Sequence, residues 1–162
     1  MWAGKFVTAK RRGKWEYVAR SRGIRAAVIL AVEDGHVLLV EQYRVPLGCN
    51  CLELPAGLIG DHDADENALT SAARELEEET GYRAGQVEVI GEFYSSPGLV
   101  SEGFTLVRAT GLEKVSDGGG VDGENIVVHR VALKDLSQFV TVKRGDGCVI
   151  DVKLLMLPGM AL

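Results

Sequence analysis

The spacing of apolar residues predicts a succession of strands along most of the chain. Residues 25–32 (RAAVILAV) are almost continuously apolar and predict a buried strand, and residues 36–42 (HVLLVEQ) predict its neighbour. Between them, Asp34 and Gly35 form a dipeptide that is a strong signal for a tight hairpin turn. Further strands are predicted over residues 15–19, 86–94, 104–109 and 124–132.

Helical periodicity is clearest between Glu66 and Gly81. Apolar residues recur there three and four positions apart and predict a helix with one face against a core. Asp63, followed three residues later by Glu66, predicts a capping box at the start of this helix, and Gly81 is suited to end it. Shorter helices are predicted over residues 133–139 and 146–157. The apolar face of the main helix comprises Leu69, Ala72, Ala73, Leu76 and Thr80.

The opposite face of the main helix carries three glutamates. Glu75, Glu78 and Glu79 stand at positions i, i+3 and i+4 and therefore share one side of a helix. Such carboxylates repel one another unless a hard divalent cation binds between them, because Mg2+ and its relatives favour oxygen ligands. A solvated helix surface is the simpler alternative, since most glutamate-rich faces are only hydrated.

Two loops rich in small residues separate the later elements. Residues 95–102 (SSPGLVSE) have the composition expected of a mobile catalytic segment. Residues 111–123 contain many glycines but lack both GxGxxG after a strand and a GK[ST] ending. We therefore interpret the second loop as a flexible turn rather than a phosphate-binding loop.

The composition is that of an ordinary globular protein. The 162 residues fit a single domain, with 46% hydrophobic and 25% charged residues. The net charge of −5 argues against nonspecific nucleic-acid binding. Three cysteines with scattered histidines favour reduced thiols over a zinc site. The N-terminal residues lack the apolar core of a signal peptide, and the longest apolar run, residues 26–32, is too short to span a membrane. We therefore expect a cytoplasmic protein without a membrane partner.

The first 22 residues combine seven lysines and arginines with four aromatic residues. Such a mixture also occurs in segments that bind nucleic acid. The alternation of residues 15–19 and the turn-forming residues 10–13 instead favour two edge strands with solvated basic side chains. We therefore expect an N-terminal β-hairpin and no nucleic-acid partner.

One long motif resembles the signature of a known family. Gly60, Glu66 and the run 74–82 (RELEEETGY) match the Nudix box at every defined position. The resemblance implies an α/β fold, namely a Nudix-type α/β/α sandwich with a mixed central sheet, preceded here by the hairpin. It also implies a single domain over residues 1–162 that hydrolyses a nucleoside diphosphate linked to another group.

Segments outside the box resemble the ADP-ribose pyrophosphatase branch of that family. They are residues 41–44 (EQYR), residues 53–58 (ELPAGL), and Pro97, which lies fifteen residues beyond the box and is followed by Glu102. In this branch the residue matching Glu102 activates the attacking water, so the resemblance makes Glu102 the candidate base. A helix glutamate remains the alternative.

The resemblance also assigns roles around the helix. It implies Mg2+, with Mn2+ as an alternative and more than one ion bound. The main-chain carbonyl of Ala56 matches a metal ligand of the family. Arg74 is expected to orient Glu78 through an ion pair, or to pair with Glu66. The remaining expected metal ligands are Glu75, Glu78 and Glu79.

Three residues are candidates for contact with the substrate. The resemblance suggests Arg44 as a contact to the diphosphate, for which a guanidinium fork is well suited. A solvated strand end is the alternative for Arg44. Glu53 is expected either to support substrate or a metal-bound water, or to form an ion pair with a nearby arginine. Pro97 completes the substrate-side set.

The reaction that the resemblance implies is hydrolysis of ADP-ribose to AMP and ribose 5-phosphate. Divalent ions would offset the charge of the diphosphate and make a water more acidic. GDP-mannose or another nucleoside diphosphate derivative is the first alternative, because the box contacts only phosphates and metal. A module that senses ADP-ribose without cleaving it is the non-enzymatic alternative. In similar Nudix proteins the N-terminal hairpin often packs on a second subunit, so a homodimer is expected.

Overall fold

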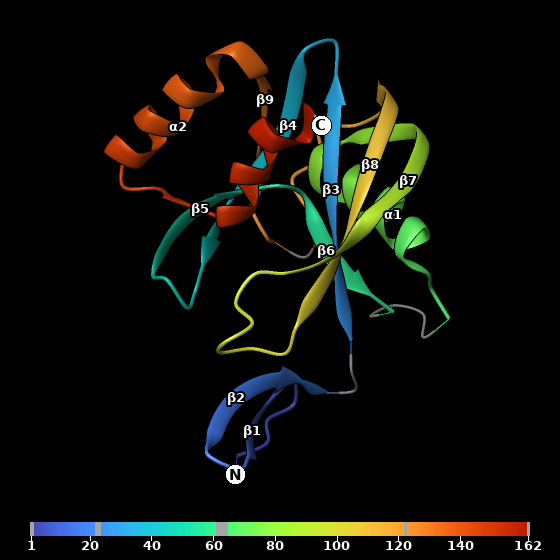
Figure 1. Cartoon of the computed structure of the whole chain (residues 1–162). Coiled ribbons are helices and arrows are strands. Elements are labelled where there is room, and N and C mark those ends of the chain that lie inside the picture. Colours follow the sequence, from blue (N-terminus) through green and yellow to red (C-terminus); the bar gives the residue numbers. More distant parts are fainter. Residues whose placement is uncertain (1, 22–23, 61–64, 122, 162) are drawn as a thin grey trace.

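A computed structural model describes residues 2–21, 24–60, 65–121 and 123–161 of the chain. A mixed sheet lies between helices, and an N-terminal hairpin extends from one end (Figure 1). The elements are β1 (Val7–Arg12), β2 (Trp15–Arg20), β3 (Arg25–Glu33), β4 (His36–Arg44), β5 (Cys49–Glu53), β6 (Ala56–Ile59), α1 (Ala68–Thr80), β7 (Tyr82–Tyr94), β8 (Gly103–Lys114), β9 (Val127–Ala132), η2 (Leu133–Asp135), α2 (Leu136–Gly145), β10 (Val149–Ile150) and η3 (Val152–Ala161).

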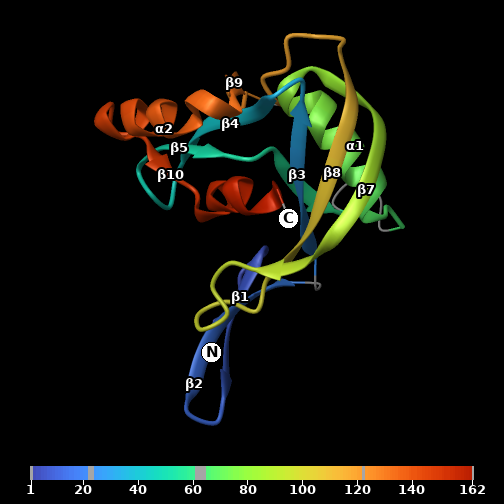
Figure 2. The same cartoon turned by 45° about the horizontal axis from the view of Figure 1, so that its top comes forward.

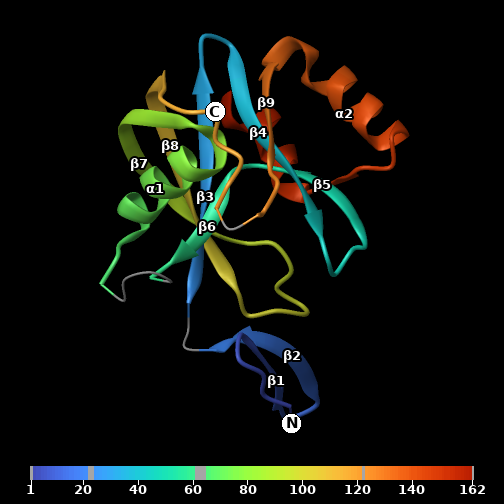
Figure 3. The same cartoon turned by 180° about the vertical axis from the view of Figure 1, so that it is seen from behind.

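The central sheet is mixed, as predicted. Its strands follow the order β10-β5-β4-β3-β8-β7, with β6 paired to β3 and β9 paired to β4. The pairs β3–β8 and β10–β5 are parallel, and the others are antiparallel. Strands β3 and β4 pair only beside their turn, at Val32–Val37 and Glu33–His36. Beyond that turn the β4 ribbon diverges from β3 (Figure 3).

Strand β3 is buried on both faces, as its continuous apolar run predicts. Ala27 and Ile29 pack with Leu76 of α1 on one face. Val28 and Leu30, which alternate with them, pack on the other face with residues of β4, β5, β8 and η3. Because successive side chains of a strand point to opposite sides, one strand serves both layers of the core. Helix α1 covers one face, and α2 and η3 lie on the other (Figures 1 and 3).

The main helix begins at a different residue from the one predicted. Asp63 lies outside the described residues, and Asn67 is the N-cap, because its side-chain oxygen accepts hydrogen bonds from the amides of Leu69 and Thr70. Glu66 instead accepts hydrogen bonds from Arg74, so its carboxylate is engaged on the flank of the helix. Gly81 ends the helix as predicted, with a φ of 74° that favours glycine.

Two predicted segments differ from the structure. Residues 111–114, predicted to belong to a flexible turn, extend β8, because they pair with the start of β7 from Tyr82 to Ala84. The predicted helix over 146–157 is instead the short strand β10 followed by the 3-10 helix η3. The exposed edge of β5 accounts for this change, because β10 pairs with it.

The hairpin of β1 and β2 was predicted, and it is antiparallel throughout its length. It projects away from the sheet and meets the molecule at the loop between β7 and β8 (Figure 2). Across the described residues, we find no helix that combines the length and apolar character needed to cross a membrane.

Candidate active site

Seven of the nine predicted site residues line one cavity. It has a volume of about 580 Å3 and lies where β4, β5, β6, α1 and the loop between β7 and β8 meet. Arg74 and Pro97 are not among its lining residues, and Pro97 lies exposed on the loop. The predicted residues that do line the cavity are Arg44, Glu53, Ala56, Glu75, Glu78, Glu79 and Glu102.

Glu79 and Glu53 are the two cavity carboxylates that are almost fully buried, each at 5% exposure. Glu79 differs from Glu53 in that no arginine or lysine forms an ion pair with it within the described residues. It accepts a hydrogen bond of 3.0 Å from the Ala56 amide, which joins the end of α1 to the start of β6. Burial raises the pKa of Glu79 to about 8 despite that hydrogen bond, and the charges of Glu75 and Glu124 act in the same direction as burial. The charge of Arg44 lowers the pKa of Glu79 but does not outweigh burial, so the site holds a carboxylate whose ionised form is only partly compensated.

Arg74 connects the helix glutamates to one another. Its guanidinium lies 2.9 Å from Glu75 Oε1, 2.9 Å from Glu78 Oε2 and 3.1 Å from Glu66 Oε1. Both partners anticipated for Arg74, Glu66 and Glu78, are thus in contact with it. Burial raises the pKa of Glu75, although Arg74 opposes the shift. Gly57 closes this side of the cavity, and a β-carbon there would overlap the Glu75 carboxylate.

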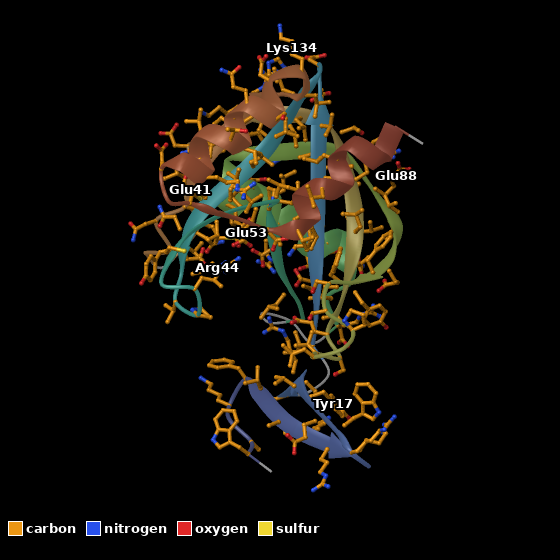
Figure 4. The ribbon with its side chains drawn as sticks, turned by 60° about the vertical axis from the view of Figure 1, so that its left-hand side comes forward. Tyr17, Glu41, Arg44, Glu53, Glu88 and Lys134 are labelled. Carbon is orange, nitrogen blue, oxygen red and sulfur yellow. The ribbon has the colours of Figure 1, made fainter. Side chains whose placement is uncertain are left out.

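Arg44 and Glu53 form a two-pronged ion pair across neighbouring strands (Figure 4). Arg44 Nε and Nη2 donate to the two Glu53 oxygens at 2.6 and 2.7 Å. The Glu53 side chain is 7% exposed, whereas that of Arg44 is 40% exposed. Hydrogen bonding to Glu53 raises the pKa of Arg44, so the guanidinium of Arg44 stays protonated. Of the two predicted roles for Glu53, the structure contains the ion pair.

Glu102 lies at the opposite side of the cavity, at the end of the loop between β7 and β8. Its carboxylate accepts a hydrogen bond from Arg20 Nε, which comes from the N-terminal hairpin. Arg20 also lines the cavity. The hairpin therefore contributes a charged residue to the site, a contribution that the sequence analysis did not predict.

Two further lining residues escaped the sequence analysis, Glu124 and Lys153. Glu124 follows the glycine-rich segment, whose Gly119 and Gly120 amides donate to the carbonyls of Glu79 and Glu78 at the end of α1. This docking delivers Glu124 to the helix glutamates. Lys153 lies in η3 and pairs with Asp151. No local pattern marks either residue, because both reach the cavity through long-range packing.

The residues present fit divalent cations. The acidic groups of the cavity are carboxylates, and carboxylate oxygens are ligands that Mg2+ and Mn2+ prefer. Six carboxylates line the cavity against three cationic side chains, those of Arg20, Arg44 and Lys153. Within the described residues, no three acidic, histidine or cysteine side chains are already grouped tightly enough to coordinate an ion. The raised pKa of buried Glu79 nevertheless indicates a place where added positive charge would be stabilising.

Known proteins resemble this chain over most of its length. A family model described as the NUDIX domain matches residues 21–147. The methanol dehydrogenase activator of Bacillus methanolicus is 37% identical over 134 residues, covering 81% of this chain and 71% of that protein. The ADP-ribose pyrophosphatase of Bacillus subtilis (strain 168) is 35% identical over 115 residues, covering 70% of this chain and 60% of that protein. The GDP-mannose pyrophosphatase of Pectobacterium atrosepticum is 34% identical over 145 residues, covering 84% and 71%.

The fold is shared with a solved structure as well. A crystal structure described as an ADP compounds hydrolase superposes with a TM-score of 0.62, covering 82% of this chain and 80% of that one, at 22% identity. This likeness concerns the fold, whereas the match to the family model includes the acidic helix and all the residues that line the cavity except Arg20 and Lys153. The chain belongs to the Nudix family and is a Nudix hydrolase.

Proposed function

We propose that this protein hydrolyses ADP-ribose to AMP and ribose 5-phosphate in a reaction that requires divalent metal ions. The observation that carries the proposal is the single cavity that combines Glu75, Glu78 and Glu79 of the Nudix box with Arg44. The acidic set suits metal ions, and the arginine suits a phosphate group. The similarity to the ADP-ribose pyrophosphatase of Bacillus subtilis supports this choice of substrate.

Nudix hydrolases generally use divalent metal ions, and we propose Mg2+, replaceable by Mn2+, with more than one ion bound. Glu75, Glu78, Glu79 and the carbonyl of Ala56 would hold them. When bound, the ions offset the charge of the diphosphate and make a water more acidic. Arg74 would hold the Glu75 and Glu78 carboxylates in position, as its ion pairs already do.

The substrate would be positioned by residues on the other strands of the cavity. Arg44 is proposed to bind a phosphate oxygen with the half of its guanidinium that remains exposed, while Glu53 fixes the plane of the fork. Pro97 is proposed to limit the conformations of the loop beside the bound substrate, because its ring fixes φ. Both roles leave the chemistry to the acidic residues.

Glu102 is the proton acceptor proposed from the sequence, and a specific observation favours Glu124 as a second candidate. The charge of Glu124 acts on both Glu75 and Glu79, so its carboxylate lies among the helix glutamates. The carboxylate of Glu102 is instead engaged by Arg20. Comparing Glu102→Gln with Glu124→Gln separates the two, because loss of the base costs roughly 10²-fold or more in kcat.

The proposal is tested by measuring product release from a panel of substrates with and without Mg2+. The panel contains ADP-ribose, GDP-mannose, NADH, diadenosine polyphosphates and nucleoside triphosphates. Metal-dependent and selective formation of AMP from ADP-ribose is the expected result. Preference for GDP-mannose, which the similarity to the Pectobacterium enzyme favours, would retain the chemistry and replace the substrate. Binding of ADP-ribose without turnover of any compound would contradict the proposal.

We further propose a homodimer formed through the N-terminal hairpin and a cytoplasmic location. The hairpin segment exposes Trp2, Phe6 and Trp15, each about 60% accessible, which is unusual for large aromatic side chains in a monomer. Sedimentation equilibrium tests the dimer, and replacing Trp15 by serine is expected to weaken it.

A further inference from the structure

The N-terminal hairpin and the loop between β7 and β8 are joined by main-chain hydrogen bonds. The Val18 amide donates to the Leu99 carbonyl, and the Ser101 amide donates to the Val18 carbonyl, both at 2.9 Å. Val18 and Val100 thereby form a parallel bridge. The loop acts as a short extra strand on the edge of β2, so its position follows that of the hairpin.

A side-chain contact continues this junction into the active site. Arg20, two residues beyond Val18, donates to the Glu102 carboxylate, and the side chains are 30% and 31% exposed. Both residues line the active-site cavity and also a second cavity of about 540 Å3 between the hairpin and the sheet. The ion pair therefore stands on the boundary between the two cavities.

Electrostatics give this ion pair a function. Glu102 shares the active-site cavity with the carboxylates of Glu75, Glu78 and Glu124, and like charges in one cavity repel one another. Arg20 is the cation that contacts Glu102 within the described residues. Without the guanidinium, repulsion from the other carboxylates favours conformations of the loop that carry Glu102 away from the cavity. The loop contains Pro97 and Gly98 and is held mainly by the bonds to Val18.

We propose that Arg20 is a positioning residue, which holds Glu102 and its loop at the active-site cavity, and that the hairpin is consequently part of the catalytic unit. This inference rests on the proposed hydrolysis for its kinetic consequences. Residue 20 lies just before the stretch that matches the family model. The hairpin therefore contributes to the site an arginine, Arg20, that lies outside the matched domain.

The test compares Arg20→Met with Glu102→Gln and with the double variant. We expect Arg20→Met to lower kcat about 10-fold or more, because small misplacement of a catalytic group is costly. Since Arg20 acts through Glu102, the double variant should be no slower than Glu102→Gln alone, and Arg20→Lys should recover part of the activity. Arg12→Met is the matched control, since Arg12 is exposed on the same hairpin and away from both cavities.

A second measurement does not depend on activity. Hydrogen exchange of the peptide containing residues 99–102 should be faster in Arg20→Met than in the wild type or in Arg12→Met. Wild-type kcat in Arg20→Met, or losses that multiply in the double variant, would overturn the inference. If no substrate is hydrolysed, exchange alone decides: faster exchange supports the positioning role and rejects only the proposed function, and unchanged exchange rejects the positioning role.

Discussion

Two buried glutamates in this protein have opposite surroundings. Glu41, at 9% exposure on β4, accepts hydrogen bonds from Asn50, His129 and Lys143. Burial alone would raise its pKa, but these three contacts lower the pKa of Glu41 to about 2. Glu79, at 5% exposure, accepts only the Ala56 amide within the described residues, and burial raises the pKa of Glu79 to about 8.

The difference separates a structural carboxylate from a functional one. The charge of Glu41 is stabilised by hydrogen bonds from groups of β5, β9 and α2, so Glu41 joins these elements. The charge of Glu79 is costly, because the Ala56 amide and the charge of Arg44 offset burial only in part and no cation of the described residues forms an ion pair with Glu79. Glu79 also faces a cavity. A protein retains such a costly charge where something that binds can neutralise it. The contrast predicts which of the two variants loses activity and which loses stability.

The largest expected effect is that of Glu79→Gln on catalysis. Removal of one metal ligand should cost about 3 kcal/mol of transition-state stabilisation, which lowers kcat/KM about 100-fold or more. The midpoint of thermal unfolding should stay close to that of the wild type, because a carboxyl with a pKa of about 8 is mostly protonated at neutral pH, and glutamine replaces one neutral group of similar shape by another. Steady-state kinetics and calorimetry measure the two quantities. Activity near the wild-type value would contradict the assignment of Glu79 to metal.

Glu41→Gln should show the converse behaviour. The variant leaves the half-buried Lys143 without its anionic partner and should reduce the free energy of unfolding by about 2 kcal/mol. Its kcat should remain close to the wild-type value. Glu88→Gln is the matched control, because Glu88 pairs with Arg108 on the surface at 64% exposure and should change stability by less than about 0.5 kcal/mol. Chemical denaturation of all three proteins tests the comparison.

Acid should reveal the same contrast. A glutamate with a pKa of about 2 in the folded state and 4.5 in the unfolded state stabilises the fold above pH 4.5. That contribution is lost as the pH falls from 4.5 through 2. The wild type should therefore lose more stability over this interval than Glu41→Gln. Equal losses in the two proteins would show that Glu41 is not held in its ionised form.

The smallest effect is expected at the cation of η3. Lys143 pairs with the buried carboxylate of Glu41. Lys153 lines the cavity but pairs with Asp151, and not with a glutamate of α1. Lys153→Met should raise KM for a diphosphate substrate about 5-fold, a loss of about 1 kcal/mol, with little change in kcat. A fall in kcat alone would assign Lys153 to the chemistry instead.

The sequence predicted the parts of the fold that depend on local pattern. The apolar run of β3, the turn at Asp34 and Gly35, and the face of α1 each follow from residues close in sequence. The N-cap was misassigned because several residues before the helix are suitable caps. Arg74 engages the Glu66 carboxylate, and Asn67 is the residue directly before the helix.

The site was predictable only where a motif carries it. Glu75, Glu78 and Glu79 follow from helical spacing. The segments that resemble the family added Arg44, Glu53, Ala56 and Glu102. Arg20, Glu124 and Lys153 come from a hairpin, a glycine-rich segment and a terminal 3-10 helix. Their arrival at the cavity depends on how these segments pack, and composition does not encode that.

The docking of the glycine-rich segment on α1 also determines when the site is completed. The amides of Gly119 and Gly120 donate hydrogen bonds to carbonyls at the C-terminal end of α1, and α1 is translated before this segment. During synthesis α1 therefore leaves the ribosome with its C-terminal carbonyls still hydrated and its glutamates far from Glu124. Contacts between distant parts of a chain form late. The nascent protein therefore completes its acidic site only after the segment beyond β8 has emerged, and a truncated chain lacks part of that site.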